Sequence, residues 1–108
     1  MEHHWFRRVL EGRLDLPRLY RTADDRDFDF NGAVADDAVV DEAWTSWRRE
    51  VEHAQAYLKG VDDLGTTLEY EGEPTEIRDI IVHMIEEYAR HVGHADLLRE
   101  CIDGRTGQ

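Results

Sequence analysis

The sequence has little of several features that would each indicate a particular class of protein. It contains one cysteine, Cys101, and two prolines in 108 residues. A single cysteine excludes an intrachain disulfide and is typical of the reducing cytoplasm. No apolar run approaches the ~18 residues that span a bilayer, and the first residues lack the apolar segment of a signal peptide. We therefore predict a cytoplasmic protein with no membrane partner.

Positive charge is also scarce. Thirteen Lys and Arg residues stand against 25 Asp and Glu residues, which gives a net charge of −12. A protein this acidic lacks the basic face that nucleic acids and anionic membranes require, so we expect neither as a partner. Much of the acidic excess falls in residues 22–30 and 35–37, without the spacing of a calcium loop.

Hydrophobic periodicity predicts an all-α protein with three helices, at about residues 2–12, 36–59 and 75–103. A long loop over residues 13–35 connects the first two helices, and an alternating stretch at 66–70 could be extended. The acidic residues at 36 and 37 suit the start of the second helix. We expect Thr75 to cap the third helix.

The two long helices carry matching apolar stripes. In the second predicted helix the apolar residues have the spacing of a heptad seam. In the third predicted helix the apolar stripe is broader than such a seam. The seam comprises Val40, Trp44, Trp47, Val51, Ala54 and Leu58, and the stripe Ile77, Ile80, Ile81, Met84, Tyr88, Ala95, Leu98 and Ile102. Two such faces stay partly uncovered unless further helices complete the ring. The pattern therefore predicts an incomplete bundle, or a homodimer in which a second copy covers the open face.

Glu87 and His91 lie one turn apart on the apolar stripe of the last helix, with His83 and His94 at its edge. A carboxylate and an imidazole at positions i and i+4 can offer two ligands to one metal ion in a bundle core. Zinc, nickel and iron all accept such donors. The residues alone leave a second interpretation open, in which the two side chains only bond each other inside the core.

Other side chains with chemical potential have simpler interpretations. His3 and His4 are expected at the surface, because the apolar residues near them already occupy the inward arc of the first helix. Cys101 lies off the face of Glu87 and is expected to be a buried, inert thiol. Trp44 and Trp47 are expected in the core.

Residues 82–104 carry a longer motif, whose first part reads Val-His-Met-Ile-Glu-Glu-Tyr-Ala-Arg-His-Val-Gly-His-Ala-Asp-Leu-Leu-Arg-Glu. This motif resembles the C-terminal signature of the DinB-like (YfiT-like) metalloenzyme superfamily. It is most similar to a bacterial branch of unknown function, which residues 4–10, His-Trp-Phe-Arg-Arg-Val-Leu, also resemble.

The resemblance implies one DinB-like four-helix-bundle domain over residues 1–108. It implies a divalent metal, zinc or nickel, held by three side chains, two of which map onto Glu87 and His91. Relatives of this kind are metal-dependent thiol S-transferases or hydrolases, some of which use mycothiol or another low-molecular-weight thiol, so the resemblance also implies a small-molecule substrate. The metal is expected to activate the thiol or a water molecule.

One departure from the family pattern bears on activity. The first ligand of the family is a His whose position falls before Glu2, so the resemblance implies an N-terminally shortened member that lacks most of the first helix. A site with Glu87 and His91 alone should bind metal weakly and be inactive. The alternative expectation is a non-catalytic helical module for binding or dimerisation.

Overall fold

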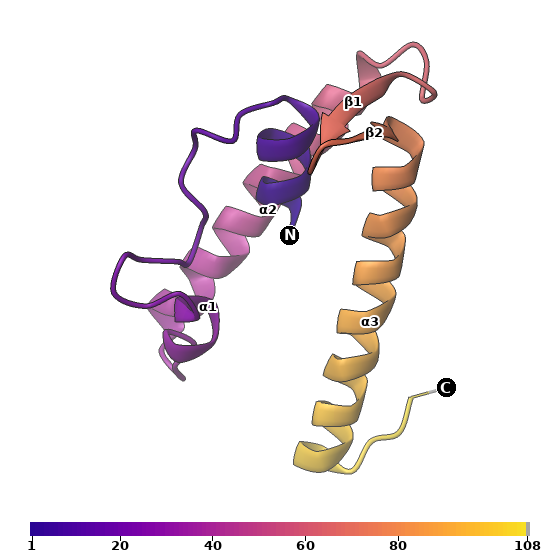
Figure 1. Cartoon of the computed structure of the whole chain (residues 1–108). Helices are drawn as coiled ribbons and strands as arrows, with labels where there is room; N and C mark the ends of the chain where they lie inside the picture. The colour runs from indigo at the N-terminus through magenta and orange to yellow at the C-terminus, as the bar shows by residue number, and fades with distance from the viewer. Residues whose placement is uncertain (108) are drawn as a thin grey trace. The chain divides into compact units, whose positions relative to one another are not determined.

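The computed structural model describes residues 1–107. The chain divides into two compact units, Met1–Leu64 and Gly65–Gln108. The described residues form four helical segments and one two-stranded sheet (Figure 1). The mainly helical class is confirmed, but the prediction of three helices left out a short fourth helix and the second strand of the sheet. The single domain and the four-helix bundle stay predictions.

The first unit begins with η1, a π-helix over His3–Leu10. Its backbone is wider than an α-helix, and the N–H of Glu11 donates to the carbonyl of Phe6, five residues earlier, at 3.1 Å. Phe6, Val9 and Leu10 are buried, as the apolar spacing predicts. The helix is shorter than the predicted range of 2–12 and ends just before Gly12.

The predicted loop of residues 13–35 contains a short helix, α1, over Phe28–Asn31. The carboxylate of Asp25 organises this segment, because it accepts hydrogen bonds from the backbone N–H of Asp27 at 2.9 Å and from the Asn31 amide at 3.0 Å. The acidic run is therefore locally ordered by its own side chains. The hydroxyl of Tyr20 donates to Glu42 at 2.8 Å and ties the loop to the next helix.

Helix α2 spans Asp37–Lys59, which confirms the predicted bounds. Asp36 is the N-cap, and its carboxylate accepts from the backbone N–H of Ala38 at 2.8 Å. The buried row of α2 shares Ala54 with the predicted heptad seam but otherwise lies on a different face. Ser46, Glu50 and Ala54, spaced four residues apart, are the buried residues of α2. Small residues on either side of Glu50 leave space for η1, which packs against this helix.

The second unit opens with a β-hairpin. Strands β1 (Thr67–Tyr70) and β2 (Glu73–Glu76) pair antiparallel, with Tyr70 opposite Glu73. Glu71 and Gly72, at the turn, both have positive φ, 53° and 85°, which is the conformation of a two-residue hairpin loop. The extended stretch expected at 66–70 corresponds to β1, whereas β2 occupies residues assigned to the loop and to the start of the last helix.

Helix α3 spans Ile77–Asp103. The prediction of Thr75 as its N-cap was wrong, because Thr75 belongs to β2. Glu76 is the N-cap instead, and it forms a capping box with Asp79. The C-terminal end of α3 was predicted correctly. Gly104 adopts the left-handed conformation at φ 72°, and its N–H donates to the carbonyl of Glu100 at 2.9 Å.

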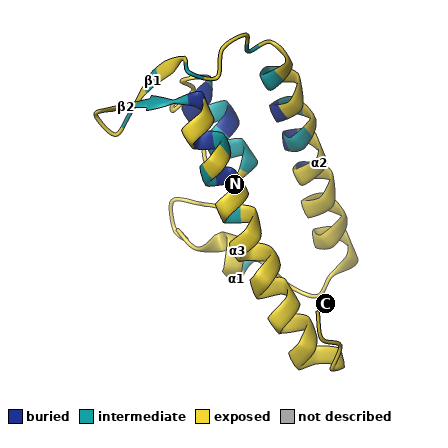
Figure 2. Ribbon diagram, turned by 90° about the vertical axis from the view of Figure 1, so that its right-hand side faces the viewer, coloured by how far each residue is buried: buried dark blue, intermediate teal, exposed yellow. Residues whose placement is uncertain are grey.

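Burial along α3 is confined to its first turns (Figure 2). Ile77, Ile80 and Met84 are buried, whereas the continuation of the predicted stripe is exposed at Leu98 and Ile102. The stripe is therefore confirmed as a buried face only over the N-terminal part of the helix. None of the helices in residues 1–107 combines the length and apolar character that crossing a membrane requires.

Candidate functional site

Glu87 lies between two imidazoles on α3. The Nε2 atom of His91 is 3.6 Å from Glu87 Oε2, and the Nε2 atom of His83 is 3.5 Å from Glu87 Oε1. Each histidine is one helical turn from the carboxylate, one before it and one after it. The side chain of Glu87 is 23% exposed, so it is accessible to solvent and to a ligand. The predicted pair is thus brought together, and His83, expected only at the flank, joins it.

These distances bear on whether the pair fits a metal ion. A separation of 3.6 Å is too long for a good hydrogen bond between the imidazole and the carboxylate. Two donors that each lie about 2.1 Å from one tetrahedral ion are about 3.4 Å apart. The spacing of Glu87 and His91 is close to that value, and a carboxylate with an imidazole suits zinc, nickel or iron.

The number of donor side chains fits a catalytic metal site less well than their spacing does. Catalytic zinc sites generally take three protein ligands and leave one position open. Among residues 1–107 no group of three His, Cys, Asp or Glu side chains is placed so as to hold a metal ion. The pair on α3 therefore supplies two donors of the right chemistry. The ring of His94 packs edge-on to the ring of His91, with centroids 6.2 Å apart.

Two other predictions about side chains were wrong. Cys101 is exposed on α3 and not a buried thiol. Trp44 and Trp47 are exposed as well and form an edge-to-face pair with centroids 5.4 Å apart. The guanidinium of Arg48 lies 5.8 Å from the centroid of the Trp44 ring. The surface of α2 thus carries an aromatic pair that the heptad pattern assigned to the core.

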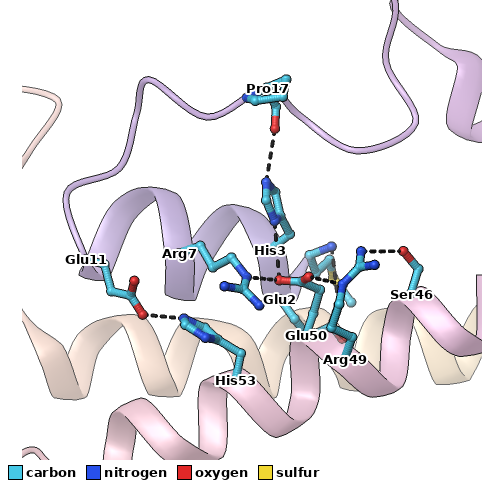
Figure 3. A network of polar contacts seen from close by, with 10 residues as sticks. Glu2, His3, Arg7, Glu11, Pro17, Ser46, Arg49, Glu50 and His53 are labelled. Atoms are coloured by element: carbon cyan, nitrogen blue, oxygen red, sulfur yellow. Dashed lines mark hydrogen bonds and ion pairs between the residues drawn. The ribbon is translucent and has the colours of Figure 1, made fainter.

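A second cluster, which was not predicted, surrounds the carboxylate of Glu50 in the first unit (Figure 3). Arg7 Nε donates to Glu50 Oε2 at 2.5 Å, and Arg49 Nε donates to Oε1 at 3.0 Å. His3 Nδ1 lies 3.3 Å from the same Oε2 atom. The Glu50 side chain is only 5% exposed. Both carboxylate oxygens are therefore occupied by basic side chains from η1 and α2.

The environment of Glu50 sets its protonation. Burial alone would raise the pKa of this carboxyl group, but hydrogen bonds from Arg7 and Arg49, with the positive charge of Arg7, outweigh it and hold the pKa below the usual value. Glu50 consequently stays ionised inside the first unit. Arg49 is itself held by Ser46, whose hydroxyl accepts from Nη2 at 3.0 Å.

Further polar contacts fix both ends of η1. At its start the other ring nitrogen of His3, Nε2, lies 3.0 Å from the carbonyl oxygen of Pro17 (Figure 3). At its end Glu11 forms a short hydrogen bond with His53 of α2. The hydroxyl of Tyr57 donates to the Leu10 carbonyl at 3.2 Å. The prediction that His3 is a surface residue was therefore wrong, because its side chain is 14% exposed and holds the loop against the helix.

Residues 1–104 match the family model of mycothiol S-transferases. Comparisons with curated proteins and with solved structures gave no significant match.

Proposed function

Because the chain belongs to the mycothiol S-transferase family, within the DinB-like superfamily that its C-terminal motif resembles, we propose that it transfers a low-molecular-weight thiol to a small electrophilic substrate. The thiol is mycothiol or a close analogue. The observation that carries the proposal is the convergence of Glu87 and His91 on α3, at 3.6 Å. A hydrolase reaction, in which water replaces the thiol, would use the same two side chains.

The proposed role of Glu87 and His91 is to hold a divalent metal ion, zinc or nickel. Such an ion, when bound, favours the thiolate over the thiol, and the thiolate is the nucleophile. Glu87 offers Oε2 on the side of His91, and His83 contacts the opposite oxygen, Oε1, so it orients the carboxylate. The partial exposure of Glu87 leaves room for the thiol beside the pair.

Two protein ligands limit the affinity for metal. We expect weak binding wherever Glu87 and His91 act alone, and weak binding would leave the transferase inactive. A third ligand that joins them would strengthen binding and support turnover.

The test is metal binding by the purified protein. Zn²⁺ and Ni²⁺ are titrated calorimetrically into the metal-free protein and into the variants Glu87→Gln and His91→Ala. We expect binding to be lost in both variants and weakened about 10–100-fold in His83→Ala, which removes the orienting contact. Consumption of mycothiol in the presence of an electrophile is followed in parallel.

A matched control lies on the same helix. Glu100→Gln removes the same chemical group as Glu87→Gln at a position outside the pair and should leave the affinity for metal unchanged. The proposal fails if Glu87→Gln and His91→Ala bind metal as the unaltered protein does, or if the unaltered protein binds neither ion.

A second candidate function, a non-catalytic binding or dimerisation module, is supported by a different observation. The C-terminal half of α3 exposes several large apolar side chains, Val92, Leu97, Leu98 and Ile102. Exposed apolar rows of this kind often mark surfaces for association. Light scattering after gel filtration distinguishes the candidates. A metal-free dimer that dissociates in Leu98→Glu favours the module, and a monomer that binds metal favours the transferase.

A further inference from the structure

Two buried nitrogen atoms on η1 lack hydrogen-bond partners. They are Nδ1 of His4 and Nε of Arg8, which lie about one turn apart on the helix. Buried polar atoms are nearly always paired, because leaving one unpaired costs roughly 1–3 kcal/mol, and more for a charged group. The guanidinium of Arg8 is always charged, so its unpaired nitrogen in particular needs an explanation.

The surroundings of His4 are positively charged. Burial first, and then the charges of Arg18, Arg8, the N-terminal amino group and His3, lower the pKa of His4 from 6.5 to about 4. The ring is therefore neutral at pH 7, and it can offer a hydrogen bond without adding to the local charge. A concentration of positive charge is unusual in a chain with a net charge of −12.

Two carboxylates of the first unit, those of Asp15 and Glu50, are already engaged. Asp15 lies near enough for the charge of Arg8 to act on it, but its two oxygens accept from Arg13 at 3.1 and 3.2 Å. Glu50 is occupied by Arg7 and Arg49. Neither carboxylate reaches the Nε atom of Arg8 or the Nδ1 atom of His4.

The loop backbone next to Arg18 is held against η1. His3 Nε2 lies 3.0 Å from the carbonyl oxygen of Pro17, which holds this part of the loop beside η1 (Figure 3). Arg18 is the next residue, and its charge acts on His4 from the loop. The helix and the loop thus bring basic groups to one place from two separate segments.

We propose that His4, Arg8 and Arg18 form a binding site for a small oxyanion, such as a phosphate or a carboxylate group. Arginine side chains bind both groups through paired N–H donors, and a bound oxyanion would supply the acceptor that Arg8 Nε lacks. The site lies within the first unit and is independent of the proposed metal pair on α3.

The experiment measures anion binding by the full chain. Inorganic phosphate and acetate are titrated at constant ionic strength, with chloride as the reference salt, and the ring signals of His4 are followed by NMR. We expect at least one oxyanion to bind at a single site and to raise the pKa of His4, because a bound anion favours the charged ring. The stronger of the two ligands identifies the kind of group preferred.

Variants connect the binding to the site. Arg8→Gln and Arg18→Gln should each raise the dissociation constant about tenfold or more, equivalent to about 1.4 kcal/mol. Arg8→Lys keeps the charge and guards against loss of folding, and it should bind more weakly because the paired donors are absent. Arg21→Gln, an exposed arginine of the same loop, is the matched control and should bind as the unaltered protein does.

Three outcomes would overturn the proposal. In the first, phosphate, acetate and chloride have the same effect on His4, which means that the two nitrogens are hydrated by water. In the second, Arg21→Gln weakens binding as much as Arg8→Gln. In the third, Arg8→Gln and Arg18→Gln, with circular dichroism spectra like that of the unaltered protein, bind the oxyanion with unchanged affinity.

Discussion

The two units each contain a carboxylate flanked by basic side chains, and the two carboxylates differ in burial and in hydrogen bonding. Glu50 is 5% exposed and receives hydrogen bonds at 2.5 and 3.0 Å from Arg7 and Arg49. Glu87 is 23% exposed, and the nearest nitrogens of His83 and His91 are 3.5 and 3.6 Å away. One carboxylate has its hydrogen-bonding capacity filled by the protein. The other does not.

This difference separates a structural role from a binding role. A buried carboxylate with paired charges and short hydrogen bonds is costly to disturb, because each partner would be left uncompensated. A partly exposed carboxylate with loose contacts contributes little to stability, but its lone pairs are available to a ligand. Glu50 therefore joins η1 to α2, and Glu87 is the better candidate for chemistry.

The largest expected effect that tests this comparison is on stability. Glu50→Ala should lower the free energy of unfolding by about 3 kcal/mol, near the low end for breaking a buried ion pair, because Arg7 is 25% exposed. Glu87→Ala should cost less than about 0.5 kcal/mol in metal-free buffer, as is usual for a surface substitution. Urea denaturation followed by circular dichroism measures both values.

Equal losses in the two variants would end the distinction between the clusters. The small residues Ser46 and Ala54, on either side of Glu50 in α2, offer a control for the effect of packing. Ala54→Gly, one turn from Glu50, alters the buried face without removing a charge and should cost about 1 kcal/mol. A loss as large as that of Glu50→Ala would show that the face is sensitive to any change.

The fold was predictable where local chemistry marks an element. Asp36 and Gly60 mark the two ends of α2, and Gly104 marks the end of α3. The second strand was missed because Glu73-Pro-Thr-Glu76 has no alternating apolar pattern and is ordered by pairing with β1. The π-helical form of η1 was not predictable either, since its buried residues Phe6, Val9 and Leu10 have the i, i+3, i+4 spacing that an α-helix also shows.

The candidate sites show the same contrast between features marked by local sequence and features that depend on contacts between distant residues. Glu87 and His91 were identified because their spacing on one helix is itself the signal. The Glu50 cluster was missed because its contacts join residues 43 and 47 positions apart along the chain. Periodicity does not say which distant arginine will meet a given carboxylate. The usable signal was the row of Ser46 and Ala54 around Glu50, which indicates a close approach by another helix.

A smaller effect is expected in the dependence of stability on pH. The pKa of Glu50 is lower in the folded protein than in the unfolded chain, so its contribution is complete above the unfolded value and is lost as the pH falls through the folded one. Glu50→Gln should therefore lose less stability than the unaltered protein between pH 5 and pH 3. Urea midpoints at several pH values measure how the free energy of unfolding depends on pH, that is, its slope against pH. His4 is present in both proteins, so its contribution to this dependence is the same in both and cancels in the comparison.

Glu52→Gln is the matched control for that slope, since it removes the same charge from an exposed position on the same helix. We expect its slope to equal that of the unaltered protein. If Glu50→Gln shows the same slope as Glu52→Gln, the ionised state of Glu50 contributes nothing to stability, and the contrast with Glu87 reduces to burial alone.

The smallest expected effect distinguishes the two arginines that hold Glu50. Arg7 is 25% exposed and bonds Glu50 at 2.5 Å, whereas Arg49 is 56% exposed and bonds it at 3.0 Å. Solvent screens the more exposed pair, so a double-mutant cycle should give a coupling of about 1–2 kcal/mol for Arg7 with Glu50 and below about 1 kcal/mol for Arg49. A larger coupling for Arg49 would mean that Glu50 orders α2 itself. The carboxylate would then stabilise one helix and not the junction between η1 and α2.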